Sequence, residues 1–92
     1  MSGRIDLDIG EIERFAADLR RFASELEQST YRIEGRFQQL GTTWRDDQYE
    51  RFASEWEATF RAINRYLDAC KGYVHHLKIK AARLRDAREE RF

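Results

Sequence analysis

The chain of 92 residues contains no proline, only five glycines and a single cysteine. With so few helix-breaking residues and a charged fraction of 37%, its composition is typical of long helices with solvated outer faces. Because Cys70 has no partner within the chain, a disulfide-stapled secreted scaffold is excluded. We expect residues 1–92 to form one domain, near the size at which a core becomes marginal without help from another chain.

Long hydrophobic runs are also absent. Residues 1–15 carry four acidic residues and no continuous apolar segment, so we expect neither a cleavable signal peptide nor a membrane span. The net charge is zero, but it is unevenly divided, with −4 over residues 1–70 (10 Arg, 14 acids) and +4 over residues 71–92 (7 Lys and Arg, 3 acids). This division predicts a dipolar rod that favours directed contacts and does little to oppose self-association.

Apolar residues repeat every seven positions in two long segments, which is the spacing of helices that pack side by side. The two series are Ile12, Leu19, Leu26, Ile33 and Leu40, and then Trp56, Ile63, Cys70, Leu77 and Leu84. They predict helices over about 8–40, with Asp8 as a candidate cap, and about 44–88. A short loop at 41–43 requires antiparallel neighbours. The predicted fold is therefore all-α, an antiparallel two-helix hairpin.

The loop carries residues suited to ending one helix and starting the next. Gly41 can adopt the positive φ that ends a helix, and Thr42 or Thr43 can cap the second helix. Asp46 and Asp47 then fall in its first turn, where negative charge is stabilised by the helix dipole. We therefore identify a turn motif of Gly41, Trp44 and Asp46.

Trp44 has two interpretations. Its ring either closes the end of the hairpin over Phe37 and Leu40 or forms part of a surface groove, and the two are compatible.

The apolar stripe is wider than a two-position seam, which is typical of a helix packed against more than one neighbour. Two helices alone cannot cover it, so we expect hairpins to dimerise into a four-helix bundle. The predicted dimer interface comprises Phe15, Leu19, Phe22, Leu26, Trp56, Phe60, Ile63 and Leu67.

The predicted helices differ in length, at roughly 50 Å and roughly 65 to 70 Å for about 1.5 Å per residue. We therefore expect a basic overhang from about Tyr73 to Phe92 beyond the start of the first helix. Its candidate docking tail comprises Lys78, Lys80, Arg83, Arg85 and Arg88. A solvated helix face, a protein-docking segment and a surface for nucleic acid or lipid are the alternatives, and the interspersed acids weaken the case for the last one.

No catalytic, cofactor-binding or metal-binding residue is expected. His75 and His76 are consecutive, so on a helix they point about 100° apart and cannot hold one metal together. Cys70 lies on the apolar stripe, where a thiol behaves as a small hydrophobe. Carboxylates alternate with arginines at surface spacings, as in Glu57 and Arg61, and a hairpin offers almost no concave pocket for a small-molecule substrate.

These features resemble the WXG-type, ESAT-like small proteins of type VII secretion. The resemblance rests on the chain length, the opening Ile5-Asp6-Leu7-Asp8, the two amphipathic helices, the turn Leu40-Gly41-Thr42-Thr43-Trp44, and the later Phe52 and Trp56. Two patterns differ: Trp44-Arg45-Asp46 replaces Trp-x-Gly, and no Tyr is followed four residues later by Asp or Glu, since Tyr66 leads to Cys70 and Tyr73 to Leu77.

The resemblance implies a homodimer or heterodimer with a related hairpin, exported folded without a cleavable signal peptide. Such a protein serves as secreted effector, carrier or chaperone, and a secretion ATPase or a larger effector is a further partner that the resemblance suggests. Without export, a cytoplasmic location is expected. The alternative function is an intracellular helical adaptor or nucleic-acid-associated protein that uses the basic carboxyl-terminal helix.

Overall fold

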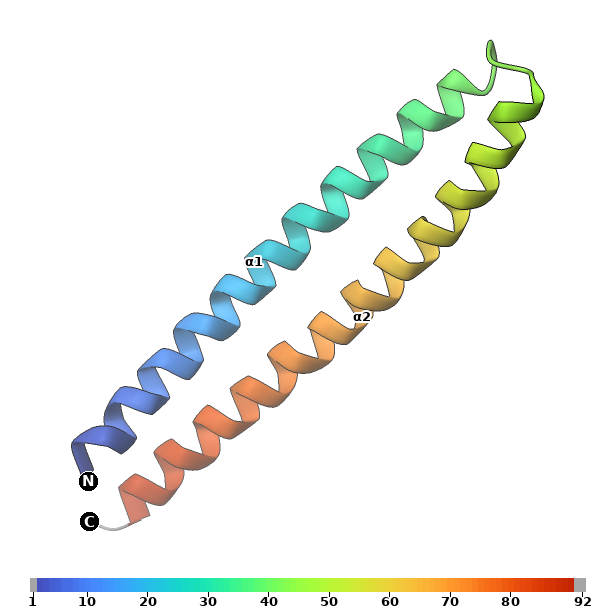
Figure 1. The fold of residues 1–92 in the computed structure, drawn as a ribbon. Helices are drawn as coiled ribbons and strands as arrows, with labels where there is room; N and C mark the ends of the chain where they lie inside the picture. Colours follow the sequence, from blue (N-terminus) through green and yellow to red (C-terminus); the bar gives the residue numbers. More distant parts are fainter. Residues whose placement is uncertain (1, 91–92) are drawn as a thin grey trace.

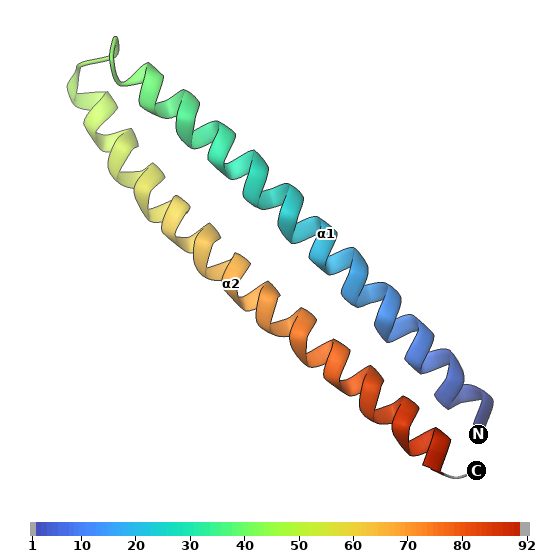
Figure 2. The ribbon, with the colours of Figure 1, turned by 180° about the vertical axis from the view of Figure 1, so that it is seen from behind.

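The computed structural model describes residues 2–90, which form two helices and no strand. Helix α1 (Ser2–Leu40) and helix α2 (Asp47–Glu90) run antiparallel and stay side by side from the bend to the two chain ends (Figures 1 and 2). The result is a rod whose Cα atoms span 70 × 16 × 16 Å. The prediction of an all-α antiparallel hairpin is confirmed.

The predicted start of the first helix is wrong, because α1 begins at Ser2 rather than near residue 8. Asp8 therefore lies inside the helix and does not cap it. The physical reason is visible in the spacing of Ile5, Ile9 and Ile12, which continues the apolar helical period toward the amino terminus. The two helices have 39 and 44 residues, so their lengths nearly match.

The predicted overhang is wrong for the same reason. Val74 and Ala81 are buried between the helices, and Arg85 donates a hydrogen bond of 2.8 Å to the Glu13 carboxylate of α1. Residues 91–92, at the end of the predicted overhang, lie outside the described residues. The fold lays residues 71–90 of the basic segment beside residues 2–20, in which five acids outnumber three arginines, so the expected separation of charge along the rod is reduced.

The core between the helices is built mainly from small side chains. Seven side chains are buried among the described residues: Ile9, Ala16, Thr30, Leu67, Cys70, Val74 and Ala81. Thr30 is the polar exception, and its hydroxyl donates to the Leu26 carbonyl oxygen at 2.6 Å, which satisfies it in its buried position. Alanine, threonine and cysteine on the contact line allow the two helices to approach closely. Little space therefore remains there for large side chains.

The bend is longer than predicted, since α2 begins at Asp47 and residues 41–46 connect the helices. The threonine hydroxyls do not cap α2. Thr42 Oγ1 donates to the Gln39 carbonyl oxygen at 2.7 Å, and Thr43 Oγ1 donates to that of Leu40 at 3.2 Å. The same two carbonyl groups also accept hydrogen bonds from the backbone amides of Thr42, Thr43 and Trp44, so the hydroxyls reinforce the end of α1.

Asp46 caps α2 instead. Its carboxylate accepts a hydrogen bond from the Tyr49 amide at 3.0 Å, which is the bond an N-cap makes to the third helical residue. Aspartate is among the strongest N-cap residues, and its negative charge also suits the helix start.

Gly41 has a different role from the one predicted, since no described glycine has a positive φ. A Cβ atom at Gly41 would overlap the hydroxyl oxygen of Tyr49 and lie 3.0 Å from the carbon that bears it. Gly41 therefore allows the Tyr49 ring to approach the end of α1 closely.

Candidate protein-protein interface

An aromatic cluster closes the bend end of the hairpin. The half-buried Trp44 lies with its ring centre 5.4 Å from that of Tyr49 and 6.2 Å from that of Phe52. Phe37 of α1 stacks on Tyr49 at 5.4 Å and also contacts Phe52 at 5.6 Å. Trp44 therefore packs on Tyr49 and Phe52 of α2, which in turn contact Phe37 of α1. Asp46 accepts the bond from the Tyr49 amide, and Gly41 leaves room for the Tyr49 ring.

The predicted interface residues do not all lie on one surface of the hairpin. Leu67 is only 3% exposed and lies in the core between the helices. The Trp56 indole N–H donates to the Glu34 carboxylate, and Phe60 meets the edge of Tyr31 at 6.0 Å. These contacts turn Trp56 and Phe60 toward the flank that carries Glu34 and Tyr31.

The opposite flank carries four of the eight exposed large apolar side chains of the described residues, namely Phe15, Phe22, Tyr66 and Tyr73. One groove on it is lined by Glu11, Ile12, Phe15, Leu77, Lys80 and Leu84, and the next by Phe15, Leu19, Tyr66, Cys70, Tyr73, His76 and Leu77. Phe22 belongs to the same flank, because its ring meets the edge of Tyr66 at 6.5 Å. We define the apolar face as Ile12, Phe15, Leu19, Phe22, Tyr66, Tyr73, Leu77 and Leu84.

The apolar face is largely exposed to solvent in the single chain. Phe15 is 57% exposed, Tyr73 is 56% exposed and Phe22 is 49% exposed. Large contiguous apolar patches on soluble proteins mark interaction sites. Leu26 and Ile63 are half-buried and continue the seven-residue series of Leu19 and Leu77. The structure therefore brings Phe15, Leu19 and Phe22 of the predicted interface together.

Five residues of the apolar face were not among the predicted interface residues: Ile12, Tyr66, Tyr73, Leu77 and Leu84. Three of them belong to the seven-residue series, and the two tyrosines are seven residues apart, so the signal was present. A side-chain hydrogen bond to Cys70 raises the pKa of the Tyr66 hydroxyl from its ordinary value of 10.0, and partial burial acts in the same direction.

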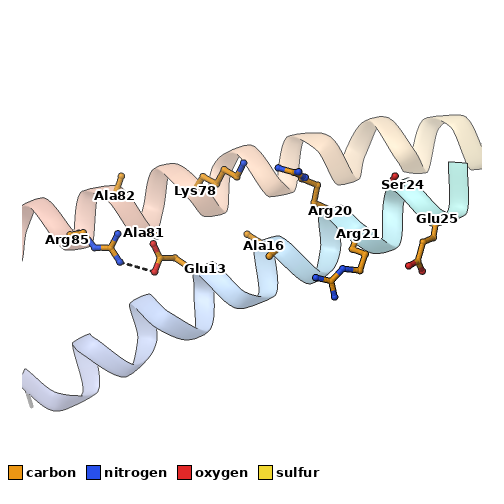
Figure 3. Close-up of a pocket in the computed structure, with 11 residues that line it drawn as sticks. Glu13, Ala16, Arg20, Arg21, Ser24, Glu25, Lys78, Ala81, Ala82 and Arg85 are labelled. Atoms are coloured by element: carbon orange, nitrogen blue, oxygen red, sulfur yellow. Dashed lines mark hydrogen bonds and ion pairs between the residues drawn. The ribbon is translucent and has the colours of Figure 1, made fainter. Parts of the chain in front are cut away.

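Charged contacts join the helices on the flank opposite the apolar face. Glu13 accepts the bond from Arg85, drawn as a dashed line in Figure 3, and Glu27 lies 4.0 Å from the Lys71 ammonium group. The hydrogen bond to Glu13 raises the pKa of the Arg85 guanidinium. Together with the Trp56 bond to Glu34, these contacts fix the register of the two helices.

The residues of the predicted docking tail are dispersed around α2. Arg85 is paired with Glu13, Lys78 lines a cleft on that flank, and Lys80 lines a groove of the apolar face. Arg83 is exposed, whereas Arg88 is half-buried. They do not form one continuous basic stripe.

Residues 2–90 contain no metal-binding cluster and no membrane-spanning stretch. No cluster of three or more His, Cys, Asp or Glu side chains is placed to hold a metal ion in that range. Over the same range, neither helix contains a stretch that is apolar enough, over the length required, to cross a bilayer.

A family model described as WXG100, proteins of 100 residues with WXG, matches residues 4–89 and thus includes both helices and the bend. Neither the comparison with curated proteins nor the comparison with solved structures gives a match.

Proposed function

Because the chain belongs to the WXG100 family, we propose that it functions by pairing its apolar face with a second helical hairpin, either its own copy or a close relative. The family is non-enzymatic and related to secretion, and its members form dimers, so the chain is a small helical protein of the type VII secretion kind. The proposed product is an antiparallel four-helix bundle.

The exposed apolar face is the observation that carries the proposal. Small residues such as Ala16 and Ala81 occupy the contact between α1 and α2, while Phe15, Phe22 and Tyr73 remain about half exposed or more. Burying a large apolar side chain is worth about 1.5–3 kcal/mol. A second hairpin laid on this face would bury several such side chains at once.

We further propose that the chain is exported without a cleavable signal peptide or serves as the dimer partner or chaperone of such a substrate. The missing export pattern at Tyr66 and Tyr73 favours the second role, in which the partner hairpin supplies the pattern. A secretion ATPase or a larger effector would then engage the pair. No cofactor or small-molecule substrate takes part in this function.

Sedimentation equilibrium tests the pairing. The purified chain alone should form a dimer if it pairs with itself, and it should form a one-to-one complex with a related hairpin if it is a heterodimer subunit. A folded, stable monomer at micromolar concentration that associates with neither its own copy nor a related hairpin would contradict the proposal.

Export is tested separately in a bacterium with a type VII system. An epitope-tagged chain, expressed with its partner hairpin, should be found in the culture medium only when the membrane ATPase of that system is intact. Its retention inside the cell in both strains would limit the role to an intracellular one.

The alternative, an intracellular adaptor or nucleic-acid-associated protein, has a distinct signature. Its binding to DNA should fall steeply with salt and should be lost when Lys78, Lys80, Arg83 and Arg85 are changed to alanine. No observation favours it, because these side chains point to different flanks and Arg85 is already paired.

A further inference from the structure

A second surface lies on the flank opposite the apolar face. It is a cleft between α1 and α2 with a floor of small side chains and a charged rim (Figure 3). The floor consists of Ala16, Ala17, Ser24, Ala81 and Ala82, and the rim consists of Glu13, Arg20, Arg21, Glu25, Lys78 and Arg85. The cleft lies beside the helix contact line, where the exposed Ala17, Ser24 and Ala82 are too short to fill the groove between the two helices.

The rim has an excess of positive charge. Four cations face two carboxylates, and one of these, Glu13, is already bound by Arg85. Arg21 lies 3.9 Å from Asp18 in an exposed pair, which water screens strongly. Among the residues that the structure describes, neither Arg20 nor Lys78 has an ion pair or hydrogen bond.

The two unpaired cations converge across the cleft. Arg20 projects from α1 and Lys78 from α2, and their charged ends turn toward one another in Figure 3. Two like charges brought together in this way repel each other, unless an anion lies between them. A guanidinium and an ammonium group from two helices form a natural site for a carboxylate or phosphate oxygen.

We propose that this cleft binds an acidic peptide segment of a partner protein, with one carboxylate between Arg20 and Lys78 and small or apolar side chains on the alanine floor. The cleft runs from Glu13 to Glu25, which is about 18 Å along the helix at 1.5 Å per residue, long enough for a peptide segment. Glu25 remains on the rim, so the cleft suits a segment whose carboxylates are separated by small or apolar residues rather than a continuous polyanion such as DNA or an anionic membrane.

This inference does not rest on pairing through the apolar face. The cleft lies on the other flank and stays accessible whether that face is covered or free. The chain would thereby hold two partners at once, a hairpin on one side and an acidic segment on the other.

The probe is a capped, fluorescein-labelled peptide of Glu-Ala-Ala-Leu repeats, and binding to the full chain is followed by fluorescence anisotropy. The same peptide with glutamine in place of glutamate is the control ligand. The double variant Arg20→Gln, Lys78→Gln should weaken binding about tenfold, since it removes two solvent-exposed ion pairs to a carboxylate. Exchanging the two cations, as Arg20→Lys with Lys78→Arg, should retain binding.

The matched control is Arg51→Gln, Arg65→Gln, which makes the same change of charge at two exposed positions of α2. It should alter binding by roughly twofold at most, because distant exposed charges act through a screened field. Amide chemical shifts should move at residues 16–25 and 78–85, and circular dichroism should show that both double variants remain helical.

Four results would each overturn the inference. They are equal binding of the glutamine peptide, equal losses in the two double variants, shifts confined to the apolar face, and preferential binding of duplex DNA or phosphatidylserine vesicles through Arg20 and Lys78. Sedimentation of the same samples reports the hairpin pairing independently, so failure of one proposal is distinguishable from failure of the other.

Discussion

Truncating Phe15 is the sharpest test of the apolar face. The ring belongs to both grooves of that face and is 57% exposed in the single chain. Phe15→Ala therefore removes surface that a partner would bury while leaving the core between α1 and α2 untouched. The free energy of unfolding of the hairpin itself should change little.

The expected loss of affinity follows from the exposed area. A phenylalanine side chain buries roughly 200 Å² when fully enclosed, so 57% exposure leaves about 110 Å² for the partner. At about 25 cal/mol per Å² this area is worth about 3 kcal/mol. Because alanine keeps its Cβ atom, the substitution should cost about 2 kcal/mol per copy.

The size of the effect also distinguishes the two kinds of dimer. In a symmetric homodimer Phe15 occurs twice, and about 4 kcal/mol corresponds to an increase of about 1000-fold in Kd; in a heterodimer it occurs once, and the increase is about 30-fold. Sedimentation equilibrium over a concentration series measures either value.

Tyr31→Ala is the matched control. Tyr31 is 58% exposed, also lies on α1, and packs against Phe60 on the opposite flank. The Tyr31→Ala substitution should leave the Kd of the dimer within roughly threefold of the original value, as expected of residues outside the buried centre of an interface. If both truncations weaken the dimer equally, or if neither does, the assignment of the apolar face as the interface is wrong.

Three further substitutions test the bend, the core and the tyrosine hydroxyl. Asp46→Ala should lower the free energy of unfolding by about 1 kcal/mol through loss of the N-cap, whereas Asp47→Ala should cost less, as measured by urea denaturation. Ala16→Leu should cost about 1–3 kcal/mol by overpacking the buried contact line, while Ala58→Leu at an exposed position should be nearly neutral. Because the pKa of Tyr66 is raised in the fold, its contribution to stability is present below pH 10 and is lost as pH rises through the raised pKa. Tyr66→Phe should therefore show a smaller fall in melting temperature above pH 10 than the original chain, and an equal fall would contradict the hydrogen bond.

The fold was predictable because the two seven-residue series are long and uninterrupted. Such a period fixes the angle between residues of one helix, and a short loop with Gly41 and Trp44 leaves antiparallel pairing as the only arrangement. The helix ends were less predictable. Thr43 and Asp46 are both competent N-caps, and the choice of Asp46 depends on where the loop and the Tyr49 ring come to lie.

The composition of the interface was predictable only in part, since a period does not specify how each helix is rotated toward its neighbour. The largest residues were assigned to one shared stripe, but the structure turns Ala16 and Thr30 inward and Phe15 outward. For the same reason Leu67 lies in the core, and Trp56 reaches Glu34 on the opposite flank. The rotation of each helix about its axis depends on which side chains fit the narrow contact line. That fit is a property of the packed pair of helices and not of either sequence segment alone.

The shape of the molecule explains why its large apolar residues lie outside. A compact domain of this length would have a radius of gyration of about 12 Å, whereas the hairpin has 20.5 Å. Two helices that touch along one line enclose no interior, so only the side chains on that line are shielded from water. Small residues allow the closest approach of the helices there. Phenylalanine and tyrosine must then face solvent or another chain. Since the apolar face and the alanine-floored cleft occupy opposite flanks, covering the first leaves the second open, and the two surfaces can act independently.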